Sequence, residues 1–173
     1  MPPQLISANF FTHEHRVRGQ IDTNDRRLTD VLNDELYSSI ELTGVEVSRV
    51  IEPQEVIHRY PAAVLMKQAI VFVIAEGERA NGVESRIFKY VEKRPHEVVL
   101  TLPSYEVSGV LHLRGTGSLQ MLLVREVGRF VPMTEARVVF TLFPKIEFSG
   151  EVAIVNKALL EVVGALESPD TTP

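Results

Sequence analysis

The sequence of 173 residues contains no cysteine and no tryptophan, and only 7% of its residues are aromatic. Without cysteine there are no disulfides, no thiolate nucleophiles and no zinc sites built on cysteine. The longest unbroken apolar run, residues 69–75, is far shorter than the roughly 20 residues that a membrane-spanning helix needs. The N-terminal residues also lack the basic and then apolar pattern of a secretory signal. We therefore expect a cytoplasmic protein without membrane association.

The chain also lacks an excess of positive charge. It has 18 basic and 23 acidic side chains, which give a formal net charge of −5. Most of the affinity of nucleic-acid binders arises from neutralising phosphates, so the total charge disfavours RNA as a partner. Cations and aromatics alternate in one segment only, around Arg86, Lys89, Lys93 and Arg94. We interpret that segment as a solvated connection rather than a nucleic-acid surface.

An interrupted apolar run occurs twice, as VLMKQAIVFVIAE at residues 64–76 and as AIVNKALLEVV at residues 153–163. Each run is preceded by the same series of patterns. A strand-like alternation has a central glycine, Gly19 or Gly109, and is followed by a leucine-rich segment that predicts a short helical turn or a bent strand. A second alternating segment contains Thr43 or Thr134. This repeated order predicts a tandem duplication.

The repeat predicts which residues correspond and which are buried. The expected pairs are Gly19/Gly109, Leu28/Leu119, Leu32/Leu123, Ile40/Val131, Leu42/Met133, Leu65/Ile154, Ala69/Ala158, Ile70/Leu159 and Val73/Val162. We expect the apolar members of these pairs other than the alanines to form the core, together with Val17, Ile21, Val107 and Leu111. The apolar alternation slips by one residue after Thr43 and after Thr134, which is typical of a β-bulge.

These motifs resemble the Sm-like fold, a small and highly bent antiparallel barrel of five strands. The glycine-centred strand, the bent strand and the last two strands with a short polar interruption carry the resemblance, and MKQAI around Lys67 looks like the corresponding turn of the Hfq-type proteins. The segment RRLTDVLN is also similar to an RLSDLLN-like segment of uncharacterised bacterial proteins.

The resemblance implies a mainly β chain of two tandem Sm-like barrels with short helical turns. Residues 5–76 would form the first barrel, residues 77–94 a linker, residues 95–167 the second barrel and residues 168–173 a disordered tail. Sm-like barrels associate when the final strand of one pairs with a bent strand of the next, so we expect a homo-oligomer formed through strand edges. The polar interruptions would be the RNA-binding residues of such a protein, namely Lys67, Gln68, Asn156 and Lys157.

The function that we predict is non-enzymatic binding or assembly, with no cofactor. RNA binding is the alternative, although the family's acidic and amide motif after the strand glycine is not reproduced: Leu28-Thr29 stands where the family has an apolar residue and Asn. A third hypothesis is a metal or hydrolase site at His13 and His15, whose imidazoles would share one side of an extended strand. Such a site needs a third ligand.

Overall fold

In a computed structural model, which describes residues 5–76 and 93–166, the protein is mainly β. In residues 5–75 the order is β1 (Leu5–Phe11), β2 (His15–Asp22), α1 (Leu28–Leu32), β3 (Ser39–Arg49), β4 (Glu52–Met66), the 3-10 helix η1 (Lys67–Ala69) and β5 (Phe72–Ala75). In residues 93–165 the order is the same: β6 (Lys93–Leu102), β7 (Tyr105–Arg114), α3 (Leu119–Arg125), β8 (Phe130–Phe140), β9 (Glu147–Asn156), η2 (Lys157–Leu159) and β10 (Val162–Ala165). We call these two segments the first and second halves.

Local patterns account for the elements. In β2, Val17, Gly19 and Ile21 are buried while their neighbours in the sequence face outward, as the alternation predicts. The leucine-rich segments are short helices rather than bent strands. Leu28 and Leu32 of α1 bury one helical face, and α3 begins after Ser118, whose hydroxyl accepts a hydrogen bond from the Met121 amide.

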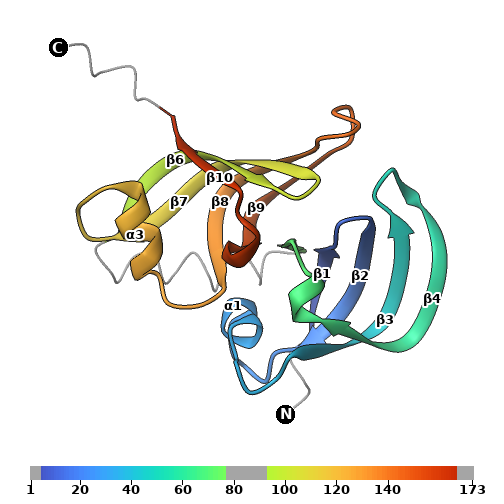
Figure 1. Ribbon diagram of the computed structural model, residues 1–173. Helices are drawn as coiled ribbons and strands as arrows, with labels where there is room; N and C mark the ends of the chain where they lie inside the picture. The colour runs from blue at the N-terminus through green and yellow to red at the C-terminus, as the bar shows by residue number, and fades with distance from the viewer. Residues whose placement is uncertain (1–4, 77–92, 167–173) are drawn as a thin grey trace.

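All ten described strands form one open antiparallel sheet in the order β10-β6-β7-β8-β9-β5-β1-β2-β3-β4. The halves meet where β5 pairs with β9, with Phe72 opposite Val155 and Val73 opposite Ile154. The expectation of closed barrels is therefore wrong. The four-residue strand β5 uses one edge for β1 and the other for β9, so neither edge remains to close a barrel. The sheet ends at β10 and at β4, the outermost strand on the right in Figure 1.

The predicted bulges are confirmed at corresponding places in the two halves. The pairing register shifts between Arg18 and Gln20 in β2·β3 and between Ser108 and Val110 in β7·β8. A glycine is needed at the second shift, because a Cβ on Gly109 would lie 2.7 Å from the Thr134 carbonyl oxygen.

The predicted register at the end of each half is wrong by one residue. The elements place Lys67 in correspondence with Lys157, Ile70 with Leu160 and Val73 with Val163. The strand pairs show the same shift of one residue. Leu65 lies opposite Ile40 in β3·β4, and in β8·β9 the residue opposite Val131, the counterpart of Ile40, is Val155. The sequence favoured the match of Ala69 with Ala158, but adjacent leucines make either register equally apolar. The 3-10 turn decides, because it begins at the lysine in both halves.

The core consists of two clusters, and each contains residues of both halves. Phe130 and Ile154 of the second half pack into the cluster of the first half, while Phe11 and Phe72 of the first half pack against Tyr105 in the other. Most of the predicted core is buried. Val162 is exposed, and four further residues are half-buried: Leu65, Leu119, Leu123 and Leu159. Leu119, Leu123 and Leu159 pack at the margin of the second-half cluster, whereas Val162 is exposed on β10.

The described residues test the predicted boundaries only in part. Most of the predicted linker and all of the predicted tail lie outside the described residues. Lys93 and Arg94, which we expected in the linker, begin strand β6. No helix in the described part of the chain is long and apolar enough to span a membrane.

Candidate functional site

Lys67, predicted to bind RNA, is buried at the start of η1. Its ammonium group donates hydrogen bonds to the carbonyl oxygens of Val31 and Asp34, at 2.8 Å and 2.7 Å. These carbonyls lie at and just after the C-terminal end of α1, where helical carbonyl groups lack partners within the helix. Burial lowers the pKa of Lys67. The side chain therefore fixes α1 to the end of β4, and its charge faces the protein.

Lys157 has the same arrangement in the second half, and Asn156 is buried beside it. The Lys157 ammonium donates to the carbonyl oxygens of Leu123 and Glu126, at 3.2 Å and 2.6 Å. The Asn156 side-chain amide donates to the Ile70 carbonyl at 2.7 Å, across the joint between the halves. Its oxygen accepts from the Ala158 amide. Both residues have structural partners in the positions where the sequence suggested RNA contacts.

The remaining predicted polar residues do not converge on one surface. Gln68 is exposed in η1, but its two neighbours in the turn point elsewhere: Lys67 is buried and Ala69 is half-buried. Of the basic segment, Arg86 and Lys89 lie outside the described residues. Lys93 forms an ion pair with Glu126 at 3.8 Å. RNA binding by Lys67, Gln68, Asn156 and Lys157 therefore stays a prediction.

The histidine pair lies where β1 turns into β2. His13 is exposed in the turn, and His15 is the first residue of β2, opposite Arg49 of β3. Within residues 5–76 and 93–166, no group of three histidine, aspartate or glutamate side chains is placed to hold a metal ion. The third ligand that the metal hypothesis requires is thus not supplied by the described part of the chain.

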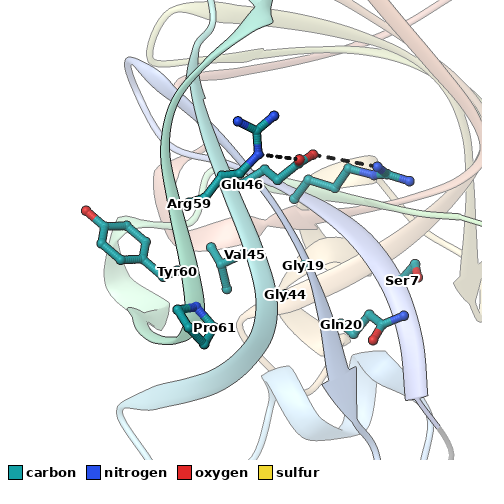
Figure 2. A pocket seen from close by; sticks show the side chains of 10 residues that line it. Ser7, Gly19, Gln20, Gly44, Val45, Glu46, Arg59, Tyr60 and Pro61 are labelled. Carbon is teal, nitrogen blue, oxygen red and sulfur yellow. Dashed lines mark hydrogen bonds and ion pairs between the residues drawn. The ribbon is translucent and has the colours of Figure 1, made fainter.

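An open hollow of about 570 Å³ lies over β2, β3 and β4 of the first half (Figure 2). Gly19 and Gly44 contribute no side chains to its floor, and Tyr60 and Pro61 form an apolar rim. Figure 2 shows Glu46 between two arginines at the opposite end. The Arg59 Nε donates to Glu46 at 3.2 Å, and Arg18 lies 3.8 Å from the same carboxylate.

The charges in this hollow are already balanced within the protein. Arg18 also forms an ion pair with Glu76 at 3.0 Å, and that hydrogen bond holds the pKa of the Glu76 carboxyl below its ordinary value. Two guanidinium groups thus face two carboxylates. An incoming anion would have to displace one of them, so the hollow is a weak candidate for an anion site.

An apolar hollow lies on the second half, between α3, η2 and β10. We call it the α3–β10 groove. It has a volume of about 570 Å³ and is lined by Leu119, Gln120, Leu123, Val124, Lys157, Leu160 and Val163. Its leucine and valine side chains are half-buried or exposed, and Val124 is 78% exposed. Apolar surface of this extent in one place is typical of a binding site.

The corresponding residues of the first half are fully buried, and the reason is visible in the packing. Leu28, Leu32, Ile70 and Val73 lie under Phe130 and Ile154, which the second half inserts into their cluster. Asn33 holds this joint from α1, since its side chain donates to the Phe130 carbonyl at 2.8 Å and accepts from the Phe130 amide at 2.7 Å. In the second half, no described residue covers the corresponding surface in this way. This difference explains why Leu119 and Leu123 are only half-buried.

The opposite end of the sheet is also apolar and uncovered. On β4, Tyr60, Val64 and Met66 alternate on one face and are 44%, 62% and 43% exposed. Their counterparts on β9 include Ile154 and Asn156, which are buried against the first half. Strand edges with exposed apolar side chains readily pair with another strand.

Sequence reasoning expected association through the final strands, of which β10 is an end of the sheet and β5 is not, and it missed these side chains. It placed Leu119 and Val162 in the core and did not select Val124, Leu160, Tyr60 or Val64. The sequence did contain a signal for this exposed apolar surface. The segments of α3 and η2 carry more apolar side chains than one inward face can bury. Comparison of the chain with protein-family models, with curated proteins and with solved structures finds no significant match.

Proposed function

We propose that the protein is a non-enzymatic assembly protein with two Sm-like halves, which binds protein partners through its unpaired strand edges. The observation that carries this proposal is the pair of sheet ends, β4 and β10, each of which has exposed apolar side chains. An unpaired strand offers backbone amide and carbonyl groups to a partner strand, and the apolar side chains beside it add affinity.

The Sm-like part of the proposal is supported by topology. In each half, the last strand pairs with the first, the first with the second, the second with the third and the third with the fourth. In each half a 3-10 turn also precedes the last strand, and a bulge lies opposite the central glycine. The repeated element order favours a tandem duplication.

The assembly role is further supported by the internal hydrogen bonds and ion pairs of the polar residues. Several of the polar candidates that lie in the described ranges have structural partners. Lys67, Lys157 and Asn156 are hydrogen-bonded to backbone groups, and Arg18 and Arg59 face carboxylates. The apolar edges, in contrast, have no such internal use.

The test is site-specific photo-crosslinking in cells that produce the chain. A benzophenone side chain is placed at Val64 of β4 or at Val162 of β10, and a control probe replaces Leu142, which is 72% exposed in the loop between β8 and β9. We expect protein adducts at both edges and not at the control. Each partner is identified by mass spectrometry, and its binding to the purified chain must be lost on Val64→Lys or Val162→Lys.

Two other outcomes would overturn the proposal. Adducts with RNA at the edges, or with a probe at Gln68, would support the RNA-binding alternative. Equal labelling at the control and at both edges would show that the edges are not used.

A further inference from the structure

We infer that α3 and the turn after it form a peripheral membrane-binding surface that prefers anionic lipids. The surface would lie on a bilayer without crossing it, since no helix in the described part of the chain is long and apolar enough to span one. The short apolar runs of the sequence led us to expect no membrane association, but a surface contact needs only a short amphipathic segment. This inference is independent of the strand edges.

The helix α3 carries apolar side chains on its outward side as well as on its inward side. Leu122 faces the core and is buried. Successive residues of a helix are about 100° apart, so Met121 and Val124 lie away from the core, and they are 50% and 78% exposed. Val127, in the turn after α3, is 95% exposed. A helix that is apolar on both sides is typically covered on both sides.

The helix α1 of the first half has a polar outward side. Its two leucines are buried, and its one exposed residue is Asp30. The turn after α1 also contains an exposed apolar side chain, that of Leu36, but Asp34 and Glu35 precede it directly. An apolar outward side is therefore not a requirement of the helix that the two halves share, and it belongs to the second half.

Arginine side chains lie beside this apolar surface. Arg125 ends α3, and its guanidinium group lies against the loop between β7 and α3, since a Cβ on Gly115 would lie 3.1 Å from the Arg125 Nη1. Glu126, the next residue, forms an ion pair with Lys93 and so does not offset the arginines. Four exposed arginines of this region form no ion pair with a carboxylate of residues 5–76 or 93–166: Arg94, Arg114, Arg125 and Arg129.

Shape and charge together favour a bilayer as the partner. A side chain that is 95% exposed, as Val127 is, projects from the protein and can enter the acyl region while nearby arginines meet the lipid headgroups. Each cation near an anionic membrane strengthens binding by about fivefold. Residues 5–76 contain 7 basic and 11 acidic side chains, so an anionic surface would also turn the first half away from it.

Vesicle flotation tests the inference directly. The full chain is mixed with vesicles of phosphatidylcholine alone, or of phosphatidylcholine and phosphatidylglycerol in equal parts, and the floated fraction gives the partition coefficient. We expect at least about tenfold stronger binding to the mixed vesicles, because only these attract the arginines. The preference should decrease as salt is added, since salt screens exposed charges.

Paired variants identify the apolar contribution. Replacing both exposed valines, as Val124→Ser with Val127→Ser, should weaken binding to the mixed vesicles by about tenfold or more, because two side chains no longer leave water. The control Leu36→Ser changes a side chain that is 86% exposed in the turn after α1 and should leave binding nearly unchanged. Circular dichroism checks that each variant is folded.

A second pair of variants identifies the contribution of charge. Arg114→Gln with Arg125→Gln should weaken binding to the mixed vesicles by about twenty-fivefold, that is, fivefold for each cation. The control replaces two exposed cations elsewhere, as Arg49→Gln with Lys145→Gln, and alters the net charge of the chain by the same amount. It should retain most of the binding.

A fluorescent probe reports which surface enters the bilayer. The sequence has no cysteine, so Val127→Cys or Leu36→Cys gives a single site for an environment-sensitive dye. We expect the emission to shift to shorter wavelength with mixed vesicles for the first variant and to stay unchanged for the second.

Three results would overturn the inference. These are equal binding of the unmodified chain to the two kinds of vesicle, variants that bind as tightly as their controls, and a dye at Val127 that stays in water. Photo-crosslinking of Val127 to a protein, without binding to vesicles, would assign the surface to a protein partner and would also overturn it. The strand edges are tested separately at Val64 and Val162, so failure of this inference leaves the proposed function standing.

Discussion

Replacing Asn156 by leucine tests the buried polar contact between the halves. The side chain is completely buried and about the size of leucine, so the substitution removes hydrogen bonds without opening a large cavity. It leaves the Ile70 carbonyl and the Ala158 amide without their side-chain partners. Arg129, the third partner, is exposed and can turn to water.

The expected loss follows mainly from the Ile70 carbonyl, because Ala158 is exposed and its amide can turn to water. A buried polar group without a partner costs about 1–3 kcal/mol, so the substitution should reduce the free energy of unfolding by about 2 kcal/mol. This is a large fraction of the roughly 5–15 kcal/mol that is typical of folded proteins. If Asn156 served RNA binding instead, its replacement would leave stability nearly unchanged.

Urea unfolding followed by far-UV circular dichroism measures the difference. Tryptophan fluorescence is not an option, because the sequence has no tryptophan. The matched control is Met66→Leu, the corresponding position on β4, which is 43% exposed and should change stability by less than about 0.5 kcal/mol. A loss below about 1 kcal/mol for Asn156→Leu, with an unchanged dependence on urea, would refute the reasoning.

Two further predictions concern stability. Gly109→Ala should destabilise the protein by about 1–3 kcal/mol in the same assay, because the new methyl group meets the Thr134 carbonyl oxygen at 2.7 Å, whereas Gly19→Ala should cost less because its nearest contact is Leu42 at 3.3 Å; equal losses would contradict this. For Glu76, the hydrogen bond from Arg18 holds the pKa of the folded carboxyl below its ordinary 4.5, so its contribution is present above pH 4.5 and is lost as the pH falls through the folded value. Stability measured from pH 7 to pH 3 should therefore fall less steeply in Glu76→Gln than in the unmodified chain, and parallel curves would show that the ion pair does not contribute.

The sequence predicted local structure well because alternation and glycine placement are local physical constraints. The alternation of Val17, Gly19 and Ile21 defined a strand, and the slip after Thr43 defined a bulge. Prediction from the sequence failed where the pairing of a strand depends on the other half of the chain. Whether β5 closes a barrel or pairs with β9 is decided by long-range contacts that no window of sequence contains.

The same limit applies at the polar interruptions. Lysine, glutamine and asparagine in a short turn between apolar strands indicate an exposed turn by composition. The structure instead brings the Lys67 ammonium to the end of α1, more than thirty residues earlier in the chain, where two carbonyl oxygens accept its hydrogen bonds. A long amphipathic side chain can satisfy a distant helix end in this way, and only the packing of α1 reveals it.

The joint between the halves should persist until the chain unfolds, for a reason that lies in two amide side chains. Asn33, which follows α1, and Asn156 of β9 together donate to or accept from the Phe130 and Ile70 backbone groups. The same joint buries Phe130 and Ile154 in the cluster of the first half. Opening it would expose both the apolar side chains and the hydrogen-bonding groups, so the two halves should unfold together in a single transition.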